Sequence, residues 1–578
     1  MTKDWSELKG TSIYFKVGRD HETALKDASA NNFHFTTEGT LVMNGEVLSQ
    51  TEEYKYAYGV EWDVTDSKPA VTRIGRDDLH RTLPVQSKMR GCIINDNGEF
   101  VEYLPDNDWT SATRDGTKGQ IMVEIPEHWR KCETEGNIRR VWISAVNLPG
   151  FKHVRKTYVG AYKGALDQTS QSNKKLCSVY NTTTQFRGGW GRSSMYDDDY
   201  RSQLGHPYKY QTLNQFRSYA RNRNKNTTEW NVYTYECYNN VFWLFVIEYA
   251  TRNSQAAFTS ELTSDGYHQG GLGDGITNLN YTKWLGWMGC DSVCPCGYTD
   301  EFGNLSGVKD ILMDYKFDAC PSTSINQVVL TKEYPENTFV IDYYNATHKL
   351  YRSKQTTLGH KLTETDYWEV VDLYQGEYDA TVTYTQYQFV SSNDNLYMCL
   401  QECIGQSVTD TTYFQKYART KTQANRYRGI ENPFGEHWNI LDGVYIRISA
   451  NVDNGGDGTS KIYVCADTDK ITDSSTTAYE TYEYIGDYFR GNGYYIKDIN
   501  FNEDGGFIIK EGGGSYNTYY CDLSWTSVPS TGEAFRALFA GGVAYNGSAR
   551  GLACVSSNPS PSDRDLASSA RLCFIPKE

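Results

Sequence analysis

Short apolar runs set off by polar and glycine-rich turns recur along the chain, and few are long enough for a helix. Runs of about four to eight residues rich in β-branched and aromatic side chains are typical of strands. Val241 to Thr251 is apolar on nearly every side and predicts a buried helix. A second helix is predicted over Leu213–Arg221, with Thr212 as its N-cap. The pattern predicts a β-rich α+β fold, with strands at Gly59–Asp63, Val71–Gly75, Ile121–Pro126, Arg140–Val146, Val444–Ser449, Lys461–Cys465 and Phe535–Gly542.

The composition narrows the classes of protein that fit. At 578 residues the chain exceeds one simple core, so several domains are expected. A formal charge of −15 argues against a nucleic-acid binder, which needs a basic surface to displace counterions. No run of about 20 apolar residues occurs, so we expect no membrane insertion, and the N-terminal residues lack the apolar segment of a signal peptide. The 14 scattered cysteines are expected to be mostly buried free thiols.

The chain divides into a small N-terminal unit, residues 1–52, and one long domain, residues 53–314 and 423–578, that residues 315–422 interrupt. Within the N-terminal unit we predict a strand at Ser12–Val17, a short helix over His21–Ala28 and a hairpin whose turn is Glu38-Gly39.

The interrupting residues 315–422 contain an internal repeat, which indicates two duplicated small modules. Tyr334–Val340 matches Tyr384–Val390, and Thr363–Trp368 matches Thr409–Phe414. Each copy resembles the small three-stranded carbohydrate-binding modules of the chitin-binding type, which implies that sugars stack on aromatic rings. Phe414 departs from the tryptophan usual in that family, which puts sugar binding by the second copy in doubt. The alternative is a spacer whose aromatic side chains fill a small core. The sugar-stacking candidates are Tyr351, Trp368, Tyr397 and Phe414.

Three motifs occur in the order expected of one family. They are Trp243–Arg252, Asn432–Gly443 and the terminal segment Phe535–Phe574. Together they resemble the C-type-lectin fold in its formylglycine-generating-enzyme branch, and most of all the ligand-binding variable proteins served by diversity-generating retroelements. The resemblance implies a C-type-lectin (formylglycine-generating-enzyme-like) domain with a small N-terminal module and an inserted pair of small β modules. It also implies that the terminal loop, residues 543–569, binds the ligand.

Residues 1–52 and the stretch from Trp62 to Cys92 also resemble structural proteins of bacteriophages of gut bacteria, including the crAss-like phages. This resemblance implies a virion protein, in a tail or head fibre, that binds a host surface receptor, either a glycan or a protein. It further implies a homotrimer, assembled in the host cytoplasm and attached to other virion proteins through the N-terminal module. A plain capping subdomain is the alternative for residues 1–52. A purely structural decoration protein that binds neighbouring subunits is the alternative for the whole chain.

The terminal loop carries the predicted receptor-binding residues, whose side chains are expected to point outward. Tyr545 and Arg550 are expected to contribute most, since Tyr and Arg bring contact area and directed hydrogen bonds at low entropic cost. Gly541, Gly542, Gly551, Arg571 and Leu572 are expected to be scaffold. The full predicted set is Val543, Tyr545, Ser548, Ala549, Arg550, Ser556, Ser557, Asn558, Ser560, Asp563 and Arg564.

Signals for catalysis and for metal binding are weak. No H-E-x-x-H, G-x-S-x-G or Walker motif occurs. The formylglycine-generating enzymes act through a cysteine pair shortly after the Gly-Gly strand, and here Cys554 stands alone in the loop. We therefore expect no enzyme and no cofactor. No metal is expected either: Cys290, Cys294 and Cys296, with Cys320 beyond them, lack a standard zinc spacing, and Asp453–Gly458 lacks the EF-hand pattern and is predicted to be a hairpin turn.

Overall fold

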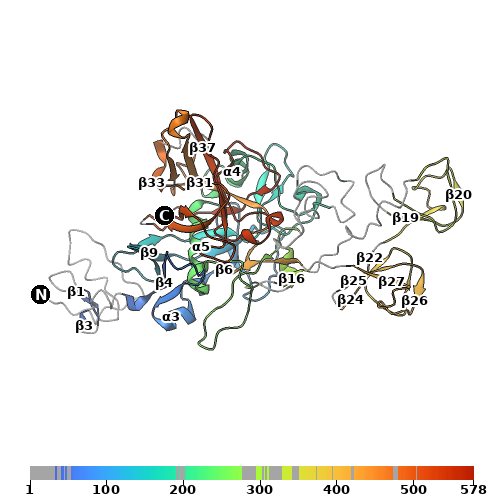
Figure 1. Cartoon of the computed structure of the whole chain (residues 1–578), viewed down its shortest axis with the longest axis horizontal. Coiled ribbons are helices and arrows are strands. Elements are labelled where there is room, and N and C mark those ends of the chain that lie inside the picture. Colours follow the sequence, from blue (N-terminus) through green and yellow to red (C-terminus); the bar gives the residue numbers. More distant parts are fainter. Residues whose placement is uncertain are drawn as a thin grey trace.

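The computed structural model describes residues 33–35, 41–43, 46–47 and 54–577, with gaps at 190–193, 195–201, 276–294, 303–304, 306, 308, 312–327, 342–349, 373, 394, 418–421, 473–479 and 503. Strands predominate over helices in these residues, which confirms a β-rich α+β protein. Figure 1 shows the main body and the inserted modules as separate bodies.

Two large sheets carry most strands of the main body. The six-stranded sheet runs β15 (Trp230–Val232), β40 (Leu572–Phe574), β12 (Thr157–Gly160), β8 (Gln120–Ile125), β6 (Arg90–Ile94) and β7 (Phe100–Tyr103). The nine-stranded sheet runs β33 (Glu483–Asp487), β32 (Ser460–Val464), β31 (Trp438–Ser449), β37 (Glu533–Ala540), β38 (Val555–Ser556), β36 (Leu523–Trp525), β34 (Tyr494–Asn500) and β35 (Ile508–Gly512), with β39 (Ser568–Ser569) paired to β31.

A five-stranded sheet and several short ladders complete the main body. The sheet runs β11 (Lys152–Val154), β9 (His128–Glu135), β10 (Ile138–Ser144), β4 (Ala57–Asp63) and β5 (Thr72–Gly75), and helix α3 (Asp77–Thr82) follows it. The ladders pair β13 (Ala165–Asp167) with β14 (Lys175–Cys177) and β29 (Arg426–Tyr427) with β30 (Ile430–Glu431).

Helix α5 (Tyr235–Tyr249) forms the centre of the main core, between β31 and β4 (Figure 1). Every residue of the helix except Glu236 is buried, which confirms the predicted buried helix. The helix begins earlier than the apolar run suggested, because the Thr234 side chain accepts a hydrogen bond from the backbone N–H of Cys237 and caps it. Trp243 stacks on Trp62 of β4, with ring centres 6.1 Å apart, and so joins the helix to the five-stranded sheet.

Helix α4 (Leu213–Arg221) has the predicted bounds and the predicted cap. Thr212 accepts from the backbone N–H of Gln215, and the Gln215 side chain accepts from the backbone N–H of Thr212. This reciprocal capping box satisfies two amides that the first turn would otherwise leave without partners.

The strands on either side of the terminal loop, β37 and β40, do not form a hairpin with each other. β37 lies inside the nine-stranded sheet, whereas β40 lies between β15 and β12 in the six-stranded sheet. The terminal loop between them therefore passes from one large sheet to the other.

The inserted segment leaves and re-enters the main body at one place. β16 (Lys309–Ile311) pairs antiparallel with β28 (Thr422–Ala424), so Ile311 lies opposite Thr422. Nearby chain ends of this kind are typical of inserted modules.

The two modules repeat one another strand for strand, as the sequence predicted. The first contains β17 (Glu333–Tyr334), β18 (Phe339–Ile341), β19 (Leu350–Ser353), β20 (Thr357–Leu358) and β21 (Trp368–Val370). The second contains β23 (Thr383–Tyr384), β24 (Phe389–Ser392), β25 (Asn395–Cys399), β26 (Cys403–Ile404) and β27 (Phe414–Tyr417), with β22 (Tyr374–Glu377) added beside β24.

The N-terminal unit is described only in part. β1 (Phe33–Phe35) pairs antiparallel with β2 (Leu41–Met43), which confirms the predicted hairpin, and β3 (Glu46–Val47) follows. The strand predicted at Ser12–Val17 and the helix predicted over His21–Ala28 lie outside the described residues. None of the helices in the described part of the chain has the length and apolar character needed to cross a bilayer.

Candidate ligand-binding surface

The first half of the terminal loop lies inside the protein. The 3-10 helix η8 (Ala544–Ala549) follows β37, and Val543, Ala549 and Arg550 are buried around it. Ser556 and Ser557, in and just after β38, are buried as well. The expectation that side chains point outward is therefore wrong for Val543, Ala549, Arg550, Ser556 and Ser557, which present little surface to a receptor.

A buried carboxylate explains why this part of the loop turns inward. Asp522 accepts hydrogen bonds from the backbone N–H groups of Gly551, at 2.6 Å, and Ala553, at 2.9 Å. The Ser254 hydroxyl oxygen accepts from the backbone N–H of Leu552 at 2.8 Å. Buried amides need such partners, so these side chains hold the turn in the core. A Cβ on Gly551 would lie 2.2 Å from Ser254 Oγ, so the close approach requires glycine and agrees with its predicted scaffold role.

The guanidinium of Arg550 lies over one tryptophan ring and near a second. Its Cζ lies 3.4 Å from the ring centre of Trp525 and 5.6 Å from that of Trp438. The two rings meet edge to face with centres 6.0 Å apart. Gly542, at a φ of +66°, makes room for this arrangement, because a Cβ there would lie 2.6 Å from the Cβ of Arg550. Arg550 thus supports the Trp525 ring from within.

The second half of the terminal loop reaches solvent. Asp563 and Arg564 are exposed, and Asn558 and Ser560 are half-buried. The backbone N–H of Ser560 donates to the Asp563 carboxylate at 2.8 Å, which closes a tight turn. We call residues 558–566 the loop tip. The side chains of Tyr545 and Ser548 lie outside the described part of the chain.

Aromatic side chains that are half-buried or exposed lie beside the strand from which the loop tip departs. Trp525 pairs with Ser556 in the β36–β38 ladder, and Ser557 donates to its carbonyl, so the tip begins next to it. Tyr495 of the adjacent β34 lies opposite Leu523, so it shares the face of the sheet that carries Trp525, whereas Tyr494 lies opposite Ser524 and faces the other side. The backbone N–H groups of Gly513 and Gly514 donate to the Tyr495 carbonyl, which brings the segment that leads to Tyr516 beside it, and Tyr516 is 63% exposed. Burial raises the pKa of Tyr495, and the Arg550 charge lowers it. We call Tyr495, Tyr516 and Trp525 the Trp525 surface.

We expect the Asp522 carboxyl to make stability depend on pH. Burial raises its pKa from 3.8 to about 7, against the lowering effect of the bonds from Gly551, Ala553 and Gln255 and of the Arg550 charge. The folded state then holds this proton more tightly than the unfolded state, so its contribution to stability is present at acid pH and is lost as pH rises from 3.8 to about 7. Urea unfolding of wild type and Asp522→Asn across this range measures the effect. A gap between the two proteins that does not change with pH would contradict it.

The aromatic residues predicted to stack on sugars mostly fill the cores of their modules. Trp368 is 1% exposed and packs edge to face on Tyr334, with ring centres 5.5 Å apart. Phe414 and Tyr397 are buried in the second module. A ring inside a core has no free face for a sugar, so the prediction is wrong for Trp368, Tyr397 and Phe414. Tyr351 is half-buried and packs against the first module's core. These side chains match the alternative of a small core.

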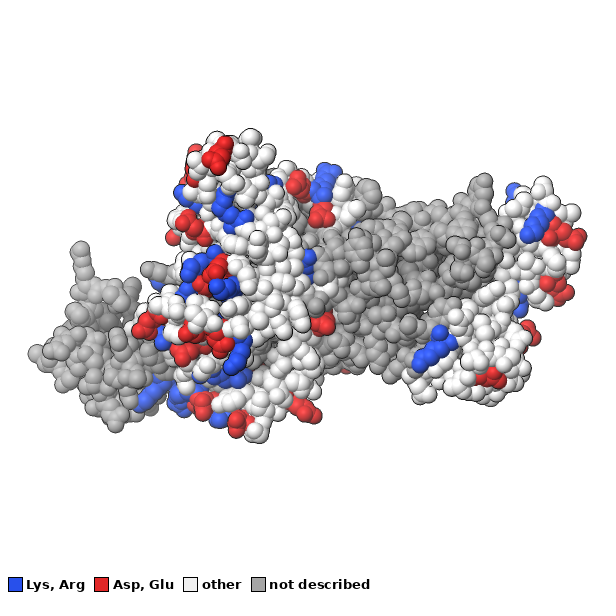
Figure 2. All heavy atoms as spheres, viewed as in Figure 1, with Lys and Arg blue, Asp and Glu red and all other residues white. Residues whose placement is uncertain are grey.

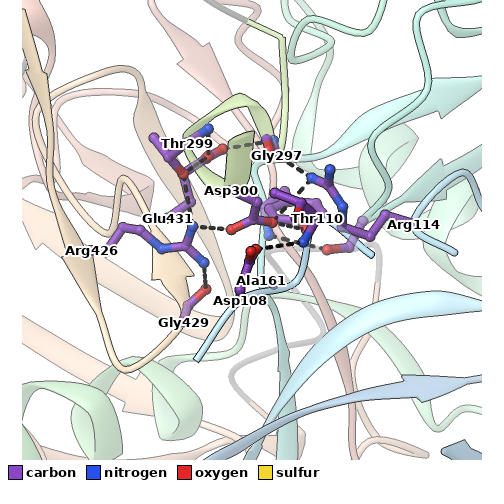
Figure 3. Close-up of polar contacts among 12 residues, drawn as sticks. Asp108, Thr110, Arg114, Ala161, Gly297, Thr299, Asp300, Arg426, Gly429 and Glu431 are labelled. Carbon is purple, nitrogen blue, oxygen red and sulfur yellow. Dashed lines mark hydrogen bonds and ion pairs between the residues drawn. The ribbon is translucent and has the colours of Figure 1, made fainter. Parts of the chain in front are cut away.

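A second buried polar cluster lies beside the base of the insertion (Figure 3). Asp300, in the 3-10 helix η6 (Tyr298–Phe302), pairs with the guanidinium groups of Arg114 and Arg426 and accepts from the Tyr162 hydroxyl. Glu431, on β30, accepts from two backbone N–H groups at the start of the same helix. Each of these carboxylates is occupied by partners within the chain, so the cluster locks η6 against the β29–β30 hairpin through which the chain returns from the insertion.

The cysteines near the predicted metal and catalytic motifs are placed only in part. Cys290, Cys294 and Cys320 lie outside the described residues, and Cys296 is buried. Cys554 is buried too, and burial raises the pKa of its thiol, which makes it a poor nucleophile. Asp453–Gly458 joins the antiparallel strands β31 and β32, which confirms a hairpin turn there.

Charge is mixed over the visible face of the main body, where Figure 2 shows Lys and Arg interspersed with Asp and Glu. An interspersed pattern gives little long-range attraction for a polyanion. In comparisons with known proteins, no family model and no curated protein matches this chain. The candidate surface therefore has to be argued from its own chemistry.

The sequence predictions missed most of this surface. Tyr495, Tyr516 and Trp525 were not among the predicted site residues, although each tyrosine stands close to glycines. Aromatic residues beside glycine-rich turns could have indicated this surface, because residues next to turns often lie at the protein surface.

Proposed function

We propose that this chain is a bacteriophage virion protein that binds the surface of a bacterial host cell through the loop tip and the Trp525 surface. The observation that carries the proposal is the pairing of half-buried and exposed aromatic rings with an adjacent exposed loop tip, whose preceding residues are fixed in the core. Rigid aromatic rings supply contact area, and Ser, Asn and charged side chains adapt their hydrogen bonds, which is the combination used by recognition surfaces.

We also propose that the main body has a C-type-lectin fold of the formylglycine-generating-enzyme branch. Support comes from the way the three motifs meet. The helix motif begins in the second half of α5, and the Asn432–Gly443 motif leads into β31, which packs on that helix. Arg571, in the terminal motif, is buried and donates to the carbonyls of Glu431, at 2.6 Å, and Asn432, at 3.0 Å.

The proposal includes two kinds of partner. The N-terminal module attaches the chain to other virion proteins, and a homotrimer raises weak single-site binding through avidity. The receptor is a glycan or a protein of the cell surface. No enzymatic activity is part of this function.

Cell binding by surface variants tests the proposal. We expect the labelled full-length protein to bind cells in a panel of gut bacteria by flow cytometry. Tyr516→Ala and Asp563→Ala/Arg564→Ala should each weaken binding by about 30-fold, the loss of one hot spot of roughly 2 kcal/mol. Both should melt close to wild type, because these side chains are exposed.

Phe100→Ala is the matched control, since Phe100 is also an exposed aromatic residue, at 48%, but lies on β7 in the other large sheet. It should bind cells like wild type. If wild type binds no cell of the panel yet assembles with neighbouring virion subunits, the chain is a structural decoration protein. If cells bind all the variants equally, the receptor site lies elsewhere.

A further inference from the structure

The second inserted module holds two thiols in contact. Cys399 ends β25 and Cys403 begins β26, and both side chains are free and buried. Their Sγ atoms lie 3.8 Å apart. A disulfide needs the sulfur atoms at about 2.05 Å, and the remaining gap is within the reach of small side-chain rotations.

The strand register explains why the two thiols meet. Cys403 lies opposite Tyr384 in the β23–β26 ladder, and Cys399 lies opposite Phe414 in the β25–β27 ladder. The chain therefore turns back between the two cysteines, and both side chains enter the core that contains Tyr384 and Phe414.

The first module offers a natural comparison. Thr357 lies opposite Tyr334, as Cys403 lies opposite Tyr384, and Ser353 lies opposite Trp368, as Cys399 lies opposite Phe414. Ser353 and Thr357 are buried there. Ser353 donates to the Pro335 carbonyl at 2.6 Å. The architecture of the module thus forms without thiols at these two positions, and the pair in the second module adds something that folding does not require.

We propose that Cys399 and Cys403 form a disulfide within the second module when the protein meets a small-molecule disulfide such as oxidised glutathione. The Cys403 thiolate, at the more accessible of the two sites, attacks one sulfur of the small disulfide and displaces a small thiolate. The Cys399 thiolate then attacks Cys403 Sγ and displaces the second small thiolate. The two S–H protons end on the two released thiols, so the protein loses two electrons and the small disulfide gains them.

The bond closes the turn between β25 and β26 covalently and fixes the core of the second module. The first module, with hydroxyls at both positions, stays open. Burial raises the pKa of both thiols, so closure should speed up as pH rises and more thiolate forms.

Peptide mapping of the full-length protein tests the proposal. The protein is incubated with oxidised glutathione, denatured, alkylated and digested with trypsin, which leaves residues 362–416 as one peptide with both cysteines and no other. We expect this peptide to be unalkylated and lighter by two hydrogen atoms, and to regain both alkylation sites after reduction. Alkylation of both thiols without prior reduction, or a glutathione adduct on each, would overturn the proposal.

Two matched variants test whether the strand register is what brings the two sulfur atoms together. Ser353→Cys/Thr357→Cys should acquire a second bond, seen as two further thiols lost to alkylation in the intact mass. Cys399→Ser/Cys403→Thr carries the residues of the first module and should fold without any such loss. If the folded Ser353→Cys/Thr357→Cys protein keeps both new thiols open under the same oxidation, the register does not bring the sulfurs together and the proposal is wrong.

Discussion

Replacing Arg217 with methionine is expected to lower the free energy of unfolding by about 3 to 5 kcal/mol. Arg217 on α4 donates two hydrogen bonds to Asp442 on β31, from Nε at 2.8 Å and from Nη2 at 2.7 Å. Both side chains are buried. Methionine fills much of the same volume but leaves the carboxylate in the core without its counter-ion, which costs far more than the pair itself contributes. Urea unfolding at neutral pH measures the loss.

Two further variants separate this effect from a simple packing change. Arg217→Met/Asp442→Asn removes both charges and keeps an acceptor for the backbone N–H of Gly443, which Asp442 binds at 2.8 Å. It should recover more than half of the lost stability. Arg76→Met breaks the exposed pair Arg76–Asp78 and should unfold like wild type, because solvent screens such a pair. Equal unfolding curves for Arg217→Met and Arg76→Met would show that the buried pair is not needed.

Much of the framework could be predicted because local signals and tertiary packing agree. Thr212 and the apolar spacing after it specify α4 without any distant partner. The all-apolar stretch after Val241 can only be accommodated inside a core, which is where α5 lies. The internal repeat was visible because equal strand registers require similar residues at equal positions.

The terminal loop could not be predicted in the same way. Its small and polar residues are typical of an exposed loop. The sequence does not reveal that buried Asp522 accepts hydrogen bonds from the backbone N–H groups of Gly551 and Ala553. Nor does it reveal that Trp525 and Trp438, which lie on separate strands, both pack against Arg550. The predictions that agree with the structure are the exposure of Asp563 and Arg564 and the scaffold role of Gly551.

The role of the aromatic residues in the inserted modules could not be predicted from the sequence either. An aromatic spacing that suits sugar binding also suits a very small core, since a short module has few other residues to bury. Trp368 and Phe414 lie on the edge strands β21 and β27, opposite Ser353 and Cys399, and both rings are buried. The register, which depends on strands distant in sequence, decides between these two roles.

Arg550→Ala is expected to destabilise the protein by about 2 to 4 kcal/mol, although the sequence favoured an exposed residue at this position. The side chain is only 5% exposed, and its guanidinium lies over the Trp525 ring. Alanine removes the cation–π contact with Trp525 and leaves a cavity where the aliphatic stem packed. It also removes a charge near Asp522 that favours its ionised form. Chemical denaturation at neutral pH, with cell binding measured on the same sample, tests this.

Arg564→Ala is the matched control, because Arg564 belongs to the same loop but is exposed. It should unfold within about 0.5 kcal/mol of wild type. Arg550→Lys should fall between the two, since lysine keeps the charge but lacks the planar group that stacks on Trp525. Arg550→Ala should also weaken cell binding, because the Trp525 ring loses the side chain that supports it. Arg550→Lys should bind cells more tightly than Arg550→Ala. Wild-type stability for Arg550→Ala together with lost binding would mean that Arg550 leaves the tryptophan pair and contacts the receptor directly.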